Sequence, residues 1–382
     1  MRRVAIVGIG HTKFGVRNAS LRELAFEAAR EALEDAKLTI DDLDSLIVGI
    51  VSAEFAKMVS PGAQIAEYLG INPKGSMRVE AACATGSAAI RAGYMTIASG
   101  LSDLVLVVGC EKMRELSTQE GLEIMSKAAD TKWEYSFCCT FAGYYAMLAN
   151  AHMKRYGTTE EQLAMVGVKN HSNALNNPYA HLHKKINIDD VLNSKMVAYP
   201  LKLYDSCPLS DGAAAVVLAS DELANKFEEP IWISGLGVAT DTASMMTRES
   251  YTEIRGATLA AREAYKYAKV DPSDIDLAEV HDAFTIGEIL AYEDLGFCKK
   301  GKGGELVEEG ETEIGGKIPV NTDGGLKAKG HPLGATGVSQ AVEIVTQLRG
   351  EAGKRQVEGA EIGLSHNVGG NGQYIFVTIY KR

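Results

Sequence analysis

The chain has 382 residues, of which 46% are hydrophobic and 23% are charged, and its formal net charge is −11. This composition is typical of a globular protein with two or more domain-sized units. The acidic balance argues against a nucleic-acid-binding or anionic-membrane-binding surface. No apolar run approaches 18 residues, and a strand pattern starts directly after Met1-Arg2-Arg3, so we expect neither a membrane span nor a signal peptide, and a cytoplasmic protein.

The cysteines are sparse for this length and show no C-x-x-C spacing. We therefore expect neither a disulfide framework nor a structural metal site. We expect the protein to lie in a reducing compartment. Cys138 and Cys139 lie in an aromatic, apolar run, which favours a packing role. The six cysteines are Cys83, Cys110, Cys138, Cys139, Cys207 and Cys298.

The N-terminal segment alternates strand and helix patterns. A β-branched run at 4–7 ends in Gly8-Ile9-Gly10, and Ser20 with Glu23 forms a capping-box pattern for a helix that runs to about residue 37. A second strand is expected at 45–50. The order predicts a βαβ unit in a parallel sheet.

Cys83 opens a run of small residues at 81–89 that predicts a tightly packed, buried helix. We place the cysteine in the first turn, where free N–H groups and the helix dipole stabilise a thiolate nucleophile. The alternative is a buried packing cysteine, because free cysteine is among the most buried residue types. A strand is expected next, at 104–108.

Residues 113–205 differ in composition and predict an inserted subdomain with helices near 141–155 and 158–175. Three histidines, His171, His181 and His183, lie there in a polar stretch. Because their spacing matches no known ligand pattern, we expect surface histidines and not a metal site. A buried strand pattern returns at 211–218.

An internal repeat gives the domain organisation. Residues 29–48 and 261–280 align without gaps, with nine of twenty positions identical. Each copy follows a strand ending in Gly-x-Gly and precedes a helix start with the sequence Ala-Thr-Gly. The repeat predicts two similar α/β halves, 1–220 (with the insertion 113–205) and 230–382, whose equivalent small-residue helices pack side by side. Loops from both halves would then converge on one site.

Three loops would meet the Cys83 loop at that site, and they carry His281, His331 and the glycine-rich stretch 369–372. A thiol and two imidazoles suit acyl transfer, because one imidazole can take the thiol proton and the other can donate to an oxyanion. Each feature has a structural alternative: His281 as a core residue, His331 before Pro332 as a turn, and the glycines as a strand connection.

These stretches together resemble the thiolase superfamily over essentially the whole chain. The resemblance implies the thiolase fold, in which two duplicated halves form a five-layered αβαβα core. The loop that carries His281 reads His-Asp-x-Phe, which is similar to the sterol-carrier-protein-like and archaeal types. The stretches that carry the resemblance are the small-residue helix at Cys83, Asp211–Leu218, His281-Asp282-Ala283-Phe284, Gly330-His331-Pro332-Leu333-Gly334-Ala335-Thr336-Gly337 and the late glycine loop.

The resemblance also implies residue roles. Cys83 would be the acylated nucleophile, His331 would activate it, and His281 would complete an oxyanion hole with His331. The N–H groups of Cys83 and Gly369 would form the second oxyanion hole, and Cys207 would face the pantetheine arm of the substrate.

The chain departs from the family at the second thiol. Most thiolases have an acid–base cysteine where this chain has Asn367, and sterol-carrier-like enzymes can use one where it has Ala283. We therefore expect His281, His366 or a water molecule to remove the α-proton of the second substrate.

The implied activity is the reversible condensation of two acetyl-CoA into acetoacetyl-CoA and CoA, feeding the mevalonate pathway. Partners implied are hydroxymethylglutaryl-CoA synthase and a zinc-ribbon/OB-fold bridging protein, with the chain itself forming a homodimer or tetramer. No metal or redox cofactor is expected. Two alternatives remain: acyl transfer from another acyl-CoA or to another acceptor, and a non-catalytic CoA-binding member.

Overall fold

The structure is a computed structural model that describes residues 2–137 and 140–382. Cys138 and Cys139, for which we predicted a packing role, lie outside the described residues. The strands are β1 (Val4–His11), β2 (Ser45–Gly49), β3 (Gly75–Val79), β4 (Leu104–Glu111), β5 (Met196–Ala198), β6 (Leu201–Lys202), β7 (Gly212–Ser220), β8 (Ile231–Thr240), β9 (Leu277–Glu279), β10 (Ile362–Gly369) and β11 (Tyr374–Lys381). The helices are α1 (Leu21–Asp35), α2 (Pro61–Leu69), α3 (Thr85–Ala98), α4 (Thr118–Ser126), α5 (Phe141–Tyr156), α6 (Glu160–Ala174), α7 (Ile188–Leu192), α8 (Asp221–Ala224), α9 (Arg255–Ala268), α10 (Thr285–Asp294), α11 (Gly303–Glu308) and α12 (Thr336–Arg349).

The main sheet is continuous through both halves. Among the described residues it has nine strands in the order β3-β2-β4-β7-β1-β8-β11-β10-β9. The two half-sheets join where β1 pairs with β8, through Ala5 with Trp232 and Ile6 with Ile231. We call this contact the β1–β8 junction.

The predicted parallel sheet is wrong, because the sheet is mixed. β2 is parallel to β4, but β7 lies between β4 and β1 and runs antiparallel to both. A local βαβ pattern contains no information about a strand that joins the sheet 160 residues or more later in the chain, roughly the length of a whole domain. The sheet is therefore mixed.

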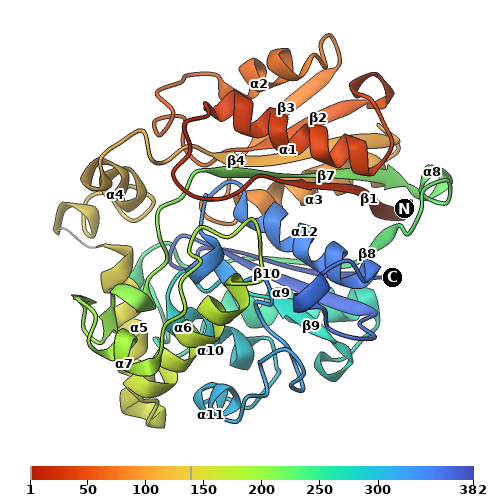
Figure 1. Cartoon of the computed structure of the whole chain (residues 1–382). Helices are drawn as coiled ribbons and strands as arrows, with labels where there is room; N and C mark the ends of the chain where they lie inside the picture. Colours follow the sequence, from red (N-terminus) through yellow and green to blue (C-terminus); the bar gives the residue numbers. More distant parts are fainter. Residues whose placement is uncertain (1, 138–139) are drawn as a thin grey trace.

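Helices cover both outer faces and fill the space between the half-sheets. α1 packs on β1 and β7, α9 packs on β8 and β11, and α3 and α12 contact each other. α12 also contacts β7 of the first half and β10 of the second, which places it between the half-sheets (Figure 1). The layered α/β fold predicted from the sequence is confirmed.

The two copies of the repeat make the same strand–helix contact. A Cβ atom added at Gly10 of β1 would lie 2.1 Å from the Ala28 carbonyl oxygen of α1. At Gly237 of β8 it would lie 1.7 Å from the Ala260 carbonyl oxygen of α9. Because each helix lies directly on its strand, only glycine fits at these positions.

The predicted pairing of the two small-residue helices is confirmed. A Cβ atom at Gly86 of α3 would lie 2.7 Å from the backbone nitrogen of Gly337 in α12. A Cβ atom at Gly337 would lie 2.3 Å from the backbone nitrogen of Ser87. The two helix starts therefore touch through their backbones, and the loops before them are held close together.

The inserted segment packs on the second half. Lys169 of α6 donates from Nζ to the carboxylate of Glu288 in α10 at 2.5 Å, and both side chains are buried. His171 is also buried and lies within hydrogen-bonding distance of the Lys184 carbonyl oxygen, so the expectation of a surface histidine is wrong there. His183 is exposed and His181 is half-buried, as a surface position allows.

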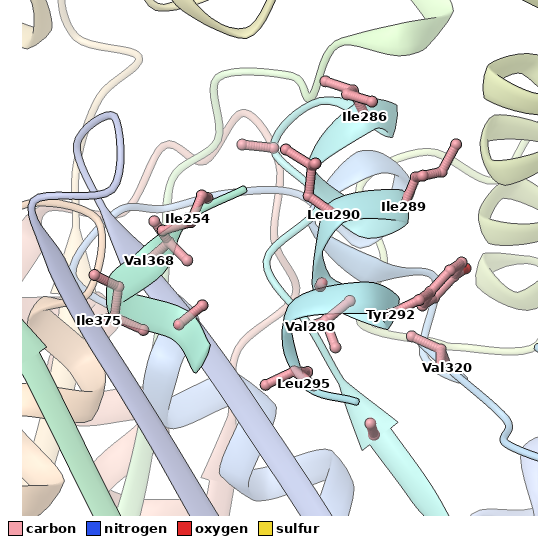
Figure 2. Packing of buried hydrophobic residues seen from close by; sticks show 14 of the residues in the cluster. Ile254, Val280, Ile286, Ile289, Leu290, Tyr292, Leu295, Val320, Val368 and Ile375 are labelled. Atoms are coloured by element: carbon pink, nitrogen blue, oxygen red, sulfur yellow. The ribbon is translucent and has the colours of Figure 1, made fainter. Parts of the chain in front are cut away.

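The largest hydrophobic cluster surrounds α10. It includes Leu364 and Val368 of β10, Ile375 of β11 and Ile289 of α10. Figure 2 shows Val368 and Ile375 together, on the side of the strands that faces α10. The even-numbered side chains of β10 therefore lie on the face covered by α10, because side chains alternate along a strand.

Candidate active site

Cys83 lies in a tight turn just before α3. The helix begins at Thr85 with Ala84 as N-cap, so Cys83 precedes the first turn instead of lying within it as we expected. The preceding residue, Ala82, has φ +48°, a left-handed conformation that costs a non-glycine residue free energy and that often occurs at functional sites. The Thr85 hydroxyl holds this turn: it donates to the Ala82 carbonyl at 2.6 Å and accepts from the Ala81 N–H at 2.8 Å.

Burial dominates the electrostatics of the half-buried Cys83 thiol. It raises the pKa of Cys83 to about 11, and the negative charge of Glu111 also raises it. A hydrogen bond from the Gly370 N–H to the thiol acts in the opposite direction and is the largest stabiliser of the thiolate. The thiolate that we expected from the helix start is therefore not the resting state, and a base must remove the proton when substrate binds.

His331 has the tautomer of a general base. The Thr336 hydroxyl donates its only proton to the Pro332 carbonyl at 3.0 Å, so at 2.6 Å it must accept from Nδ1–H of His331. The free Nε2 lone pair is buried and has no partner in the described part of the chain. Cys83 packs against the hydrophobic cluster that contains Leu333, two residues after His331, so the thiol and the His331 loop lie in the same region.

His281 has the opposite tautomer. Its Nδ1 lies 3.1 Å from the Asn367 amide nitrogen, which can only donate, so the ring proton is on Nε2. The Asn367 oxygen accepts from the Ser87 hydroxyl of α3 at 3.1 Å, which leaves the amide nitrogen for His281. His281 is therefore a hydrogen-bond donor at Nε2, as an oxyanion hole requires.

The two imidazoles lie against each other in the interior. Their ring centroids are 5.1 Å apart with nearly perpendicular planes. Burial lowers the pKa of His331 to about 3 and lowers that of His281 well below 6.5, with the neighbouring histidines adding to the second shift. Both rings are therefore neutral near pH 7, so the tautomers decide their roles.

His366 lies on a different face from this pair. Asn367 points toward Ser87 and His281, so its neighbour His366 shares the other face of β10 with Leu364 and Val368. Both ring nitrogens of His366 are buried without a partner among the described residues, and burial lowers its pKa to about 3. The geometry does not bring His366 to Cys83.

The remaining predicted site residues lie around Cys83. A Cβ atom at Gly369 would be 2.4 Å from the Ala81 carbonyl oxygen, so the glycine loop lies directly against the Cys83 turn. The N–H that reaches the sulfur belongs to the next residue, Gly370. Cys207 is half-buried and donates from its backbone nitrogen to the Ala283 carbonyl oxygen at 2.9 Å.

Sequence reasoning missed the positioning roles of Asn367, Thr336 and Asp282. Asn367 stood out only as a missing thiol, and Thr336 only as part of the repeated Ala-Thr-Gly. Asp282 accepts from the Leu326 N–H at 2.7 Å and thereby holds the π-helix Gly325–Lys329, which leads into the His331 loop. The Ala-Thr-Gly repeat was a usable signal, since Thr85 and Thr336 both brace the loop before a helix.

The described residues contain neither a cluster of metal ligands nor a membrane-spanning helix. No group of three or more His, Cys, Asp or Glu side chains in 2–137 and 140–382 could hold a metal ion. No helix in the same residues has the length and apolar character needed to cross a membrane.

Comparison with known proteins agrees with this geometry. Residues 4–222 match the thiolase N-terminal domain, and residues 237–382 match the thiolase C-terminal domain-like family. The chain therefore belongs to the thiolase family, and it is an acyltransferase of that family. The boundaries 1–220 and 230–382 stay predictions.

Named relatives cover the full chain. Acetyl-CoA acetyltransferase from Methanothermobacter thermautotrophicus is 50% identical, with all of both chains covered. Sterol carrier protein 2 from Bos taurus is 38% identical over 99% of this chain and 72% of its own length. A solved structure described as the Ltp2-ChsH2(DUF35) aldolase superimposes with a TM-score of 0.88 at 28% identity, covering 99% of this chain and 97% of that one.

Proposed function

We propose that the chain is an acetyl-CoA C-acetyltransferase, which condenses two acetyl-CoA into acetoacetyl-CoA and CoA through an acetyl-Cys83 intermediate, and which also runs the reverse cleavage. The observation that carries this proposal is the pair of opposite tautomers at His331 and His281. One ring presents a lone pair and the other a proton. An acyl transfer to a thiol needs both a proton acceptor and an oxyanion donor.

The first half-reaction follows from these groups. His331 takes the Cys83 proton at Nε2, and the thiolate attacks the thioester carbonyl. Nε2–H of His281 donates to the oxyanion. The proton on His331 then passes to the departing CoA thiolate, leaving acetyl-Cys83 and CoA. The N–H groups of Cys83 and of the 369–370 stretch are the donors available to the acyl-enzyme carbonyl.

The second half-reaction joins two carbons. A base removes the α-proton of a second acetyl-CoA, and the resulting enolate attacks the acetyl carbonyl on Cys83. Thioesters suit this step because their α-protons are more acidic than those of oxygen esters. The acetyl specificity is supported by the relative that is named acetyl-CoA acetyltransferase at 50% identity.

Mass spectrometry after mixing with acetyl-CoA tests the covalent step. The expected result is one added acetyl group on the Cys83 peptide, absent in Cys83→Ala and retained in a matched Cys298→Ala control. A chain that binds CoA without acetylation would instead be the non-catalytic alternative. Acetoacetyl-CoA formed from acetyl-CoA alone tests the full reaction.

A second candidate is acyl transfer involving another acyl-CoA or another acceptor. It is favoured by Asn367 and Ala283, which leave the two usual positions without an acid–base thiol. A series of acyl-CoA chain lengths, assayed in both directions, separates the two. Acetylation of Cys83 without acetoacetyl-CoA would select the second candidate.

The proposed context is the mevalonate pathway, with hydroxymethylglutaryl-CoA synthase and a zinc-ribbon/OB-fold bridging protein as partners. Condensation is uphill, so direct transfer of the product to the next enzyme would favour it. The Ltp2-ChsH2(DUF35) structure supports a partner of that kind for a related fold. Size-exclusion chromatography of the mixed proteins tests the complex. The same measurement on the chain alone distinguishes a homodimer from a tetramer.

A further inference from the structure

A short antiparallel pairing brings Cys207 opposite Ala283. Ser206 pairs with Phe284, and the Cys207 N–H donates to the Ala283 carbonyl at 2.9 Å. Thr285 closes the pairing, because its hydroxyl donates to the Asp205 carboxylate at 2.8 Å. Directly opposite residues in such a pair have Cβ atoms about 5 Å apart on the same face. The Cys207 thiol therefore occupies the space beside the Ala283 methyl group.

A buried ammonium lies beside this thiol. Lys327 is 1% exposed, and its Nζ donates to the Ser206 carbonyl at 2.7 Å, one residue before Cys207. The π-helix that carries Lys327 is fixed by Asp282, the neighbour of Ala283. The Lys327 ammonium is therefore positioned next to the Cys207–Ala283 pair.

Cys207 and Lys327 influence each other's protonation. Burial raises the pKa of Cys207 to about 12, and the positive charge of Lys327 is the largest effect that lowers it. Burial lowers the pKa of Lys327 to about 8, and the interaction with Cys207 is the largest effect that raises it. Leu209, two residues after Cys207, packs against the same hydrophobic cluster as Cys83, which places the two thiols in one region.

Neither of the two histidines expected to act in the second half-reaction offers a base there. His281 holds its ring proton on Nε2 and accepts from Asn367 at Nδ1, so neither nitrogen has a free lone pair in the plane of the ring. His366 lies on the α10 face of β10. Ala283 and Asn367 cannot take a proton.

We propose that Cys207 is the acid–base residue of the carbon–carbon bond-forming step, with Lys327 as the positioning residue that stabilises its thiolate. This inference rests on the proposed function. At rest Cys207 is a thiol, and the reactive form of the pair is the minor one in which the thiol proton has moved to Lys327. Cys207 Sγ takes the proton from the methyl carbon of the second acetyl-CoA.

The cycle balances without an outside reagent. The enolate carbon bonds to the acetyl carbonyl carbon, the bond from that carbon to Cys83 Sγ breaks, and Cys83 leaves as a thiolate. The proton on Cys207 then passes to Cys83. Cys207 is then again the thiolate of the reactive form beside the Lys327 ammonium, and Cys83 is a thiol.

Three variants test the proposal: Cys207→Ala, the double variant Cys207→Ala with Ala283→Cys, and Cys298→Ala as a matched half-buried control. Two rates are measured for each: acetylation of Cys83, and exchange of the acetyl-CoA methyl hydrogens with deuterated solvent. Acetylation reports folding and the first half-reaction. Exchange reports removal of the α-proton.

In Cys207→Ala we expect methyl exchange and condensation to fall at least about 100-fold, a size typical of general acid–base catalysis, while Cys83 acetylation stays within about threefold of the starting protein. The double variant should recover at least about tenfold of the lost exchange, because the thiol returns to the opposite residue of the same pair. Cys298→Ala should match the starting protein.

Lys327→Met tests the positioning role separately. Removing the ammonium should slow alkylation of Cys207 at pH 8, because the thiolate loses its opposite charge. A purely structural role for Lys327 would leave the Cys207 alkylation rate unchanged, and that result would overturn the pairing.

The proposal fails if Cys207→Ala exchanges and condenses at the normal rate, or if its defect is confined to KM for acetyl-CoA, as a contact to the pantetheine arm alone would give. These results differ from failure of the proposed function, in which the unmodified chain itself neither acetylates Cys83 nor forms acetoacetyl-CoA.

Discussion

The Asn367 amide donates to Nδ1 of His281 at 3.1 Å, and this contact determines what the histidine can do. An acid–base cysteine is usual at position 367 in thiolases, and this chain has replaced it with a group that cannot exchange a proton. The amide instead fixes the proton of His281 on Nε2. Position 367 therefore offers no base, and the His281 ring proton lies on Nε2, where the proposed oxyanion donor needs it.

Asn367→Asp should reverse this arrangement. A carboxylate beside Nδ1 draws the ring proton to that atom and raises the pKa of His281, so the neutral ring loses its Nε2 donor. Only the imidazolium keeps it. We expect the thiolysis rate at pH 8 to fall about 100-fold or more, the usual effect of losing one oxyanion donor, and to recover as the pH is lowered.

A pH–rate profile checks this prediction, with Asn367→Leu as the matched control. Leucine removes the hydrogen bond without reversing the tautomer, so the control should lose less activity and keep the shape of the original profile. Parallel profiles for both variants would contradict the tautomer argument.

Thr336→Val should impair acetylation of Cys83. Valine has nearly the shape of threonine but cannot accept from Nδ1–H of His331, so the ring loses the contact that orients its Nε2 lone pair. We expect the acetylation rate to fall about tenfold to a hundredfold, part of the 10²–10⁴ that a general base typically contributes. Rapid-quench mass spectrometry measures this rate.

The control for Thr336→Val is Thr346→Val on the same helix. The Thr346 hydroxyl donates only to the Val342 carbonyl of its own helix. Its loss should leave acetylation unchanged. Equal losses in the two variants would assign the effect to the stability of α12 and not to His331.

Glu111→Gln should lower the pKa of Cys83. The buried Glu111 carboxyl group accepts from the backbone N–H groups of Val51 and Gly334, and its charge raises the Cys83 pKa. A nearby negative charge disfavours the thiolate, so removing that charge lowers the thiol pKa. Burial raises the pKa of Glu111 to about 8, so the charge is present mainly above that pH. There the alkylation rate of Cys83 should rise, by up to about tenfold for each pH unit by which the Cys83 pKa falls.

Peptide mass spectrometry after iodoacetamide treatment measures the Cys83 rate across pH 7–10. Glu222→Gln, at an exposed residue of α8, is the control and should follow the original curve. A slower rate in Glu111→Gln would mean that the carboxylate supports the thiolate through the fold of the turn, against this prediction.

Gly86→Ala should destabilise the fold. The new methyl group would lie 2.7 Å from the backbone nitrogens of Gly337 and Val338, and backbone atoms cannot rotate away as a side chain can. We expect the free energy of unfolding to fall by about 1–3 kcal/mol, as for other overpacked interiors. Urea unfolding measures it. Gly75→Ala is the control, since its Cβ would meet nothing within 4 Å, and equal midpoints for the two variants would contradict the prediction.

The sequence predicted those parts of the fold that leave a local pattern. The Gly-x-Gly strands and the alanine-rich helices of the two repeats were recognisable because close strand–helix contact permits only small residues, at Gly10 with Ala28 and at Gly237 with Ala260. The position of β7 between β4 and β1 could not be predicted, because strand order depends on pairing between distant segments. The same limit applies to the β1–β8 junction.

The site shows a similar division. The residue types and loops of Cys83, His281 and His331 could be predicted, but their protonation could not, since it depends on Thr336 and Asn367. The helix-start argument at Cys83 failed because burial outweighs the helix dipole. The position of Cys207 opposite Ala283 depends on an isolated pairing that has no periodic pattern to reveal it.

The backbone contact between α3 and α12 has a consequence for synthesis of the chain. Ribosomes release the N-terminal residues first, so α3 and the Cys83 turn emerge about 250 residues before the helix that packs on Gly86, well over a typical domain length. During that interval the small-residue face of α3 has no covering partner. A nascent chain therefore carries Cys83, the proposed nucleophile, long before His331 and α12 have been synthesised, so the proposed site cannot be complete until the last quarter of the chain is made.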